Sequence, residues 1–143
     1  MQVVERSALV TYSAAEMFAL VNDVSRYPEF LPWCVGAQVH ELSVTERTAT
    51  LRVVRGVLQA EFTTLNQLTP NARIQMRLTH GPFRDLQGEW RFDDISARGS
   101  RIHFRVEFEF KNRLTAAAFN SAFESLCGTI VDAFAQRARE VYG

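Results

Sequence analysis

The side chains best suited to metal or thiol chemistry are three histidines and two cysteines in a chain of 143 residues. His40, His80 and His103 lie far apart in sequence, and neither Cys34 nor Cys127 has a second cysteine or a histidine nearby. Zinc ligands usually come in pairs separated by roughly two to four residues. The sequence therefore predicts no metal site and no cofactor, and it favours reduced, packed thiols over a disulfide.

Acid–base catalysis needs two titratable groups that face each other. Asp93 and Asp94 are adjacent, so on a strand they point to opposite faces. We interpret them as the end of a strand that runs into a loop. No nucleophile is paired with a base, and there is no G-x-S-x-G, phosphate-binding glycine loop or dinucleotide fingerprint. This pattern favours a protein that is not an enzyme.

One polar pair interrupts an otherwise apolar row. Thr64 and Asn66 continue the alternation that begins with Leu58, Ala60 and Phe62. They could orient the polar head of a ligand inside the protein. The alternative, which we favour at this stage, is that the strand leaves the core at this point.

Arginine accounts for fifteen of the sixteen basic residues, and the formal net charge is zero. On the solvent face of the expected strands arginines are mixed with glutamates, which favours an ion-paired solvent surface over an RNA-binding face. The arginines concerned are Arg52, Arg73, Arg77, Arg91, Arg101 and Arg105. The charge balance gives no case for a DNA partner.

The longest periodic element is a helix at the C-terminal end, from Asn112 to Tyr142. Apolar residues recur at spacings of three and four, with Asn112 as a candidate N-cap and Gly143 at the stop. About thirty residues give a rod of roughly 45 Å. A helix with one apolar side of that length needs a large apolar partner.

Alternating runs before that helix supply the partner. They cover residues 49–53, 58–64, 74–78, 86–92 and 102–110, after a first strand at 3–11. Between the first strand and these runs, Ser13 and Glu16 form a capping-box pattern for a helix that ends near Asp23, and Pro28 opens a short helical turn. We therefore predict one α+β domain over residues 1–143, a curved antiparallel sheet of about six or seven strands with a long C-terminal helix.

Neither a signal peptide nor a transmembrane span is evident, and we expect a cytoplasmic protein. One helix about 10 Å wide cannot cover the whole inner face of such a sheet. The remainder must be closed by the Ser13–Pro32 segment, by side chains alone or by a ligand in an apolar chamber between sheet and helix. We expect Tyr27, Phe30 and Trp33 at its lid or mouth. The small helix residues Ser125, Gly128 and Thr129 either let the sheet approach the helix closely or contact a ligand. The other candidate ligand contacts are Phe62, Trp90, Phe104, Phe108, Phe119 and Phe123.

Three stretches resemble the START-like coenzyme Q-binding family, including its bacterial ribosome-association toxin and oligoketide cyclase-like branch. They are the segment 21–34, VNDVSRYPEFLPWC; Gly81-Pro-Phe followed by Leu86, Gly88, Trp90 and Phe92, then Phe108-Glu-Phe; and the ending VDAF…RAREVYG, 131–143. The resemblance implies a helix-grip fold, in which a curved sheet wraps a long C-terminal helix around a lipid-sized cavity. This sequence departs from the family at Leu65, directly before Asn66, where the family often has Arg.

The resemblance implies two functions. The first is non-catalytic binding of a hydrophobic molecule, ubiquinone or a related polyprenyl lipid, in support of respiration, with transient contact to a membrane. The alternative is a toxin that binds the large ribosomal subunit and blocks subunit joining. A cyclase or dehydrase activity is a third implication, but the sequence offers no inward acid–base pair to support it.

Overall fold

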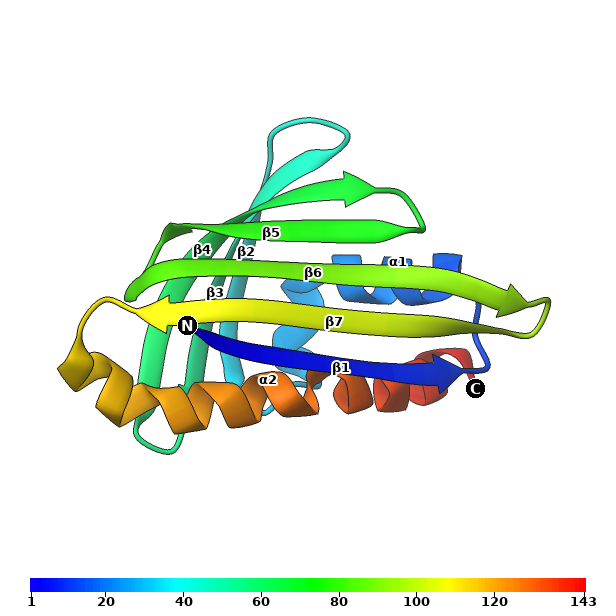
Figure 1. Cartoon of the computed structure of the whole chain (residues 1–143). Coiled ribbons are helices and arrows are strands. Elements are labelled where there is room, and N and C mark those ends of the chain that lie inside the picture. Colours follow the sequence, from blue (N-terminus) through cyan, green and yellow to red (C-terminus); the bar gives the residue numbers. More distant parts are fainter.

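The fold is a curved seven-stranded antiparallel sheet that wraps around one long helix (Figure 1). A computed structural model describes residues 1–143. The strands are β1 (Gln2–Val10), β2 (Cys34–Glu41), β3 (Glu46–Arg55), β4 (Leu58–Thr69), β5 (Arg73–His80), β6 (Phe83–Ser96) and β7 (Gly99–Phe110). This arrangement confirms the predicted α+β helix-grip fold.

Strand order in the sheet is β1-β7-β6-β5-β4-β3-β2. From β2 to β7 every strand pairs with its neighbour in sequence, as short turns predict. The first strand instead pairs with the last, with Gln2 opposite Phe108 and Val10 opposite Ser100. The β5–β6 ladder is the shortest of the β3–β7 ladders and runs only from Arg73–Arg91 to Arg77–Gln87.

Two helical segments connect β1 to β2. α1 (Ala14–Asn22) begins with the predicted capping box, because Glu16 N–H donates to Ser13 Oγ at 3.1 Å and Ser13 N–H donates to Glu16 Oε1 at 3.0 Å. The 3-10 helix η1 (Val24–Glu29) follows and contains Pro28.

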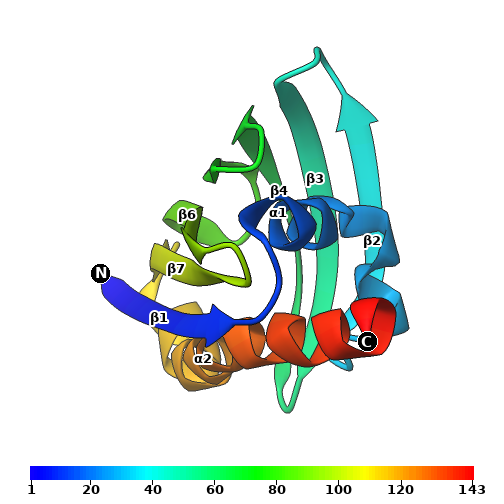
Figure 2. The same cartoon turned by 90° about the vertical axis from the view of Figure 1, so that its right-hand side faces the viewer.

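α2 (Arg113–Tyr142) confirms the predicted C-terminal helix. Asn112 accepts from Thr115 N–H at 2.9 Å and caps its start, and Gly143 N–H donates to the Arg139 carbonyl at its end. In Figure 2, α2 closes one side of the curved sheet, and α1 lies in the space between the two arms of the sheet. No helix combines the length and hydropathy needed to cross a bilayer.

Two expectations about strand ends are wrong. β6 does not stop at the aspartate pair but continues to Ser96, and Asp94 Oδ1 accepts a hydrogen bond from Ala14 N–H at 2.8 Å, at the start of α1. β4 does not leave the core at Thr64, because the strand runs on to Thr69 with both Thr64 and Asn66 buried. In both places the strand continues in ladder pairing with a neighbouring strand, Asp94 opposite Ser100 and Asn66 opposite Met76.

Candidate functional site

An apolar cavity lies between the inner face of β3–β7, α2 and η1. Its volume is about 90 Å³, and sixteen of its nineteen lining residues are hydrophobic. The lining residues are Val24, Tyr27, Trp33, Ala49, Leu51, Val53, Phe62, Thr64, Asn66, Met76, Leu86, Gly88, Trp90, Phe104, Val106, Phe123, Leu126, Cys127 and Ile130. These positions share a face because strand residues alternate and α2 residues recur every three or four.

The structure brings six of the nine candidate contacts to this cavity: Tyr27, Trp33, Phe62, Trp90, Phe104 and Phe123. Tyr27 and Trp33 are buried within its wall rather than placed at an exposed mouth. The Tyr27 hydroxyl donates to the Val21 carbonyl, which fixes the ring between η1 and α1.

The other three candidate contacts lie outside the cavity. Phe108 is fully buried in an aromatic cluster, 4.7 Å from the Phe123 ring centroid, and Phe119 packs against Phe110 at 5.8 Å. Phe30 packs on Phe134 at 5.3 Å, under the Arg137 guanidinium. Phe108 and Phe119 therefore pack among other rings of the hydrophobic core, and Phe30 packs in the contact between η1 and α2.

Besides Tyr27, Trp33, Trp90 and Cys127, the hydrogen-bonding side chains in this wall are Thr64 and Asn66. They are 5% and 4% exposed, and the Thr64 hydroxyl donates to Asn66 Oδ1 at 2.6 Å. Sequence periodicity placed them on the correct face, but it could not show that the strand continues inside the core.

The only titratable groups in the wall are Tyr27 and Cys127. Burial raises the pKa of each well above its ordinary value, so both are neutral near pH 7. Cys34 is also a free, buried thiol, and burial raises its pKa as well. Nowhere do three or more His, Cys, Asp or Glu side chains gather as a metal site would require.

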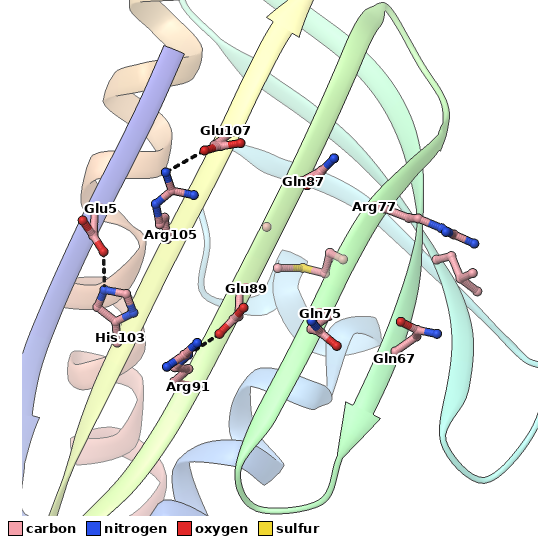
Figure 3. A pocket seen from close by; sticks show the side chains of 13 residues that line it. Glu5, Gln67, Gln75, Arg77, Gln87, Glu89, Arg91, His103, Arg105 and Glu107 are labelled. Carbon is pink, nitrogen blue, oxygen red and sulfur yellow. Dashed lines mark hydrogen bonds and ion pairs between the residues drawn. The ribbon is translucent and has the colours of Figure 1, made fainter. Parts of the chain in front are cut away.

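Met76 and Gly88, which were not among the predicted site residues, lie opposite each other in the β5–β6 ladder. Both line the cavity, and both also line a hollow of about 640 Å³ on the opposite, outer face of the sheet (Figure 3). We call this place, where glycine leaves β6 without a side chain and the same two residues border both spaces, the thin part of the sheet. The glycine inside an alternating run was the signal for such a point.

The outer hollow is polar and largely ion-paired. Arg105 contacts Glu107 at 2.6 Å, His103 contacts Glu5 at 2.8 Å, and Arg91 pairs with Glu89 (Figure 3). Arg77 makes no ion pair and projects from the same face. The expected mixture of positively and negatively charged side chains is present, and Arg77 is the arginine of this hollow that has no ion pair.

The small residues of α2 do not line the cavity. Ser125, Gly128 and Thr129 border a separate polar hollow together with Arg6. A Cβ atom on Gly128 would lie 3.3 Å from Arg6 Nη2, and Arg55 donates to Ser125 Oγ at 2.9 Å. The close approach that Gly128 permits is therefore made by an arginine of β1.

An antiparallel sheet that grips a long C-terminal helix around an apolar cavity defines the START-like class of proteins. The chain belongs to the family described as "Polyketide cyclase / dehydrase and lipid transport", whose profile matches residues 10–135.

Similar proteins carry different names. A protein of Vibrio cholerae named "Ribosome association toxin RatA" is 46% identical over 143 residues, which is 100% of this chain and 99% of that protein. The Drosophila melanogaster "Coenzyme Q-binding protein COQ10, mitochondrial" is 31% identical over 96% of this chain and 59% of its own length. Among solved structures, the ZhuI aromatase/cyclase from Streptomyces sp. R1128 has a TM-score of 0.88 at 16% identity, covering 99% of this chain and 96% of that one. That last likeness concerns the fold alone.

Proposed function

We propose that the protein binds and chaperones a hydrophobic small molecule, a polyprenyl quinone such as ubiquinone, in support of respiration and without catalysis. The observation that carries this proposal is the apolar cavity with one buried hydrogen-bonding pair, Thr64 and Asn66, in its wall. A quinone has the matching chemistry, an apolar body with polar oxygens on its ring. The relative named as a coenzyme Q-binding protein supports the same ligand class.

The absence of catalysis is proposed from the chemistry of the wall. Catalysis of cyclisation or dehydration needs a proton donor and a proton acceptor within reach of the substrate. The wall offers a phenol and a thiol that burial keeps neutral, and the phenol already donates to a backbone carbonyl. No carboxylate or imidazole lines the cavity.

Ligand binding requires this cavity to widen. Its 90 Å³ is below the roughly 300–1,000 Å³ of typical small-molecule sites. The wall residue best able to move is Met76, which is half-buried and unbranched. Its displacement would connect the cavity with the thin part of the sheet.

The test is organic extraction of the purified protein followed by mass spectrometry, combined with quinone uptake from liposomes. We expect a bound lipid and measurable uptake. An Ala49→Leu variant fills the cavity and should reduce uptake, whereas the same change at exposed Ala15 on α1 should not. If the protein carries no lipid and takes up no quinone, the proposal is wrong.

A second candidate function is association with the large ribosomal subunit. Relatives named as ribosome association toxins support it, as does the unpaired Arg77 on the outer face, since arginine binds RNA phosphates well. Over-expression followed by sucrose-gradient profiling tests it. Free subunits should accumulate with this protein on the large subunit, less so for Arg77→Glu than for Arg98→Glu in the β6–β7 turn. Intact joined ribosomes, with the protein at the top of the gradient, would exclude it.

A further inference from the structure

The side-chain amide of Asn66, in the wall of the cavity, donates no hydrogen bond to the protein. Thr64 gives its single hydroxyl proton to Asn66 Oδ1 at 2.6 Å. The Asn66 amide nitrogen carries two further protons, and it makes no hydrogen bond to any protein group. Asn66 is 4% exposed and lines the cavity, so its side chain borders a space whose other lining residues are mostly apolar.

A second unpaired donor lies beside the first. Arg47 is directly opposite Asn66 in the β3–β4 ladder, so the two side chains project from the same face of the sheet. Its Nε is buried without a hydrogen-bond partner. The other guanidinium nitrogens are engaged by the Asn22 carbonyl at 3.0 Å and by Glu41 at 2.9 Å.

Buried polar groups in folded proteins are nearly always hydrogen-bonded, because an unpaired donor forfeits its hydration without compensation. The unpaired amide of Asn66 borders the cavity, so an acceptor for it must be an atom inside the cavity that is not part of this chain. An acceptor-only oxygen, such as a ketone or quinone carbonyl, fits an end of the cavity that offers N–H groups.

We propose that Asn66, held by Thr64 and flanked by Arg47, recognises a carbonyl oxygen of an otherwise apolar ligand. This inference rests on the proposed function, since it assigns the polar contact within the same cavity. It also orients the ligand, with its carbonyl toward β3–β4 and its apolar part toward Trp90, Phe104 and α2. Met76, opposite Asn66 in the β4–β5 ladder, then occupies the space next to the recognised oxygen.

The experiment compares two probes, an alkylated para-benzoquinone and an alkylbenzene with the same chain, by calorimetric titration of the whole protein. The Asn66→Leu variant removes the amide while keeping its approximate volume. The Thr64→Val variant removes the hydroxyl that holds it. Thr63→Val is the matched control, because Thr63 lies on the outer face and bonds to Thr50 at 2.7 Å.

We expect wild type and Thr63→Val to prefer the quinone over the hydrocarbon. Asn66→Leu should weaken quinone binding by about tenfold, the equivalent of one hydrogen bond to a buried donor, and should leave hydrocarbon binding unchanged or tighter. Thr64→Val should produce a smaller loss, because the amide stays but is free to rotate. Near-equal thermal stability of the variants shows that the fold is intact.

Three outcomes would contradict the inference, and one of them would also contradict the proposed function. If both probes bind wild type equally, or Asn66→Leu keeps the quinone preference, the amide bonds only a water and the inference is wrong while the proposed function stands. If neither probe binds any form of the protein, the proposed function itself fails and the inference fails with it. A quinone preference lost equally in Thr63→Val would place the effect outside the cavity and contradict the inference.

Discussion

Met76 occupies the space that a side chain at Gly88 would fill. A Cβ atom built on Gly88 would lie only 2.9 Å from Met76 Cε, and the two residues are partners in the β5–β6 ladder. In register they continue a row across the inner face of the sheet, from Arg47 through Asn66, Met76 and Gly88 to Val106. Met76 therefore separates the donor groups at Asn66 from the thin part of the sheet.

Met76→Ala should enlarge the cavity and strengthen quinone binding. The truncation removes a half-buried side chain, so the free energy of unfolding should fall by about 1–2 kcal/mol, less than the roughly 2–5 kcal/mol typical of a fully buried methionine. Denaturant unfolding and quinone titration measure the two effects. Gln75→Ala, on the adjacent outer-face position, should change neither. Weaker quinone binding in Met76→Ala would show that Met76 holds the ligand instead of blocking it.

Asp94→Ala should destabilise the protein by about 1 kcal/mol, as loss of a helix-capping acceptor usually does. Asp94 Oδ1 accepts from Ala14 N–H at 2.8 Å and so ties β6 to the start of α1. Asp93 makes no such bond and is exposed, which makes Asp93→Ala the control with no expected effect. Urea unfolding of the three proteins decides the point. Equal midpoints for both variants would mean that the cap contributes nothing.

Gly128→Ala should stabilise the protein by about 0.5–1 kcal/mol, because glycine within a helix is less favourable than alanine by roughly this amount. The new methyl group would meet the guanidinium of Arg6, with Nη2 nearest at 3.3 Å, and Arg6 is an exposed, flexible side chain that can shift. Thermal unfolding checks this. A lower melting temperature that is restored by adding Arg6→Ala would show that Arg6 cannot move aside.

Alkaline pH should destabilise the protein by deprotonating thiols in the unfolded chain. Burial raises the pKa of Cys127 above its ordinary value of 9.0 in the folded state. Above that pH the unfolded state loses the proton and the folded state keeps it, so stability falls as pH rises. Near and above pH 10.0, unfolded-state ionisation of Tyr27 adds to the fall, since its pKa is raised in the folded state as well.

The measurement is the free energy of unfolding against pH under reducing conditions. Cys127→Ala should remove up to about 1.4 kcal/mol per pH unit from the slope that begins near the thiol pKa. Cys34 should contribute in the same direction, because burial raises its pKa too. A slope that is identical in Cys127→Ala would show that this thiol is accessible to water in the native state.

Local signals were sufficient for most of the fold. The capping box at Ser13 and Glu16, the cap at Asn112 and the stop at Gly143 are contacts within a few residues, so they were visible in sequence. Alternation predicted the inner and outer faces of the strands for the same reason. The pairing of β1 with β7 was not predicted. It joins segments about a hundred residues apart, and the sequence of neither strand indicates which strand it pairs with.

The candidate site was predicted less completely than the fold. Periodicity identified inward aromatic residues, but an inward position can face either another ring or a void. Phe108 and Phe119 meet other rings, whereas Phe62 and Trp90 meet the cavity. Only the packing of α2 and η1 on the curved sheet decides which one each side chain meets.

The sequence by itself determined the layout of the protein: a sheet with one apolar face and a long helix to cover it. Those properties follow from residue type and period, which act over a few positions along the chain. The tertiary structure alone decided that Asn66 is buried, that its amide protons lack an acceptor, and that Arg47 lies beside it. Burial and hydrogen-bond satisfaction depend on which distant strands become neighbours, and no local pattern carries that information.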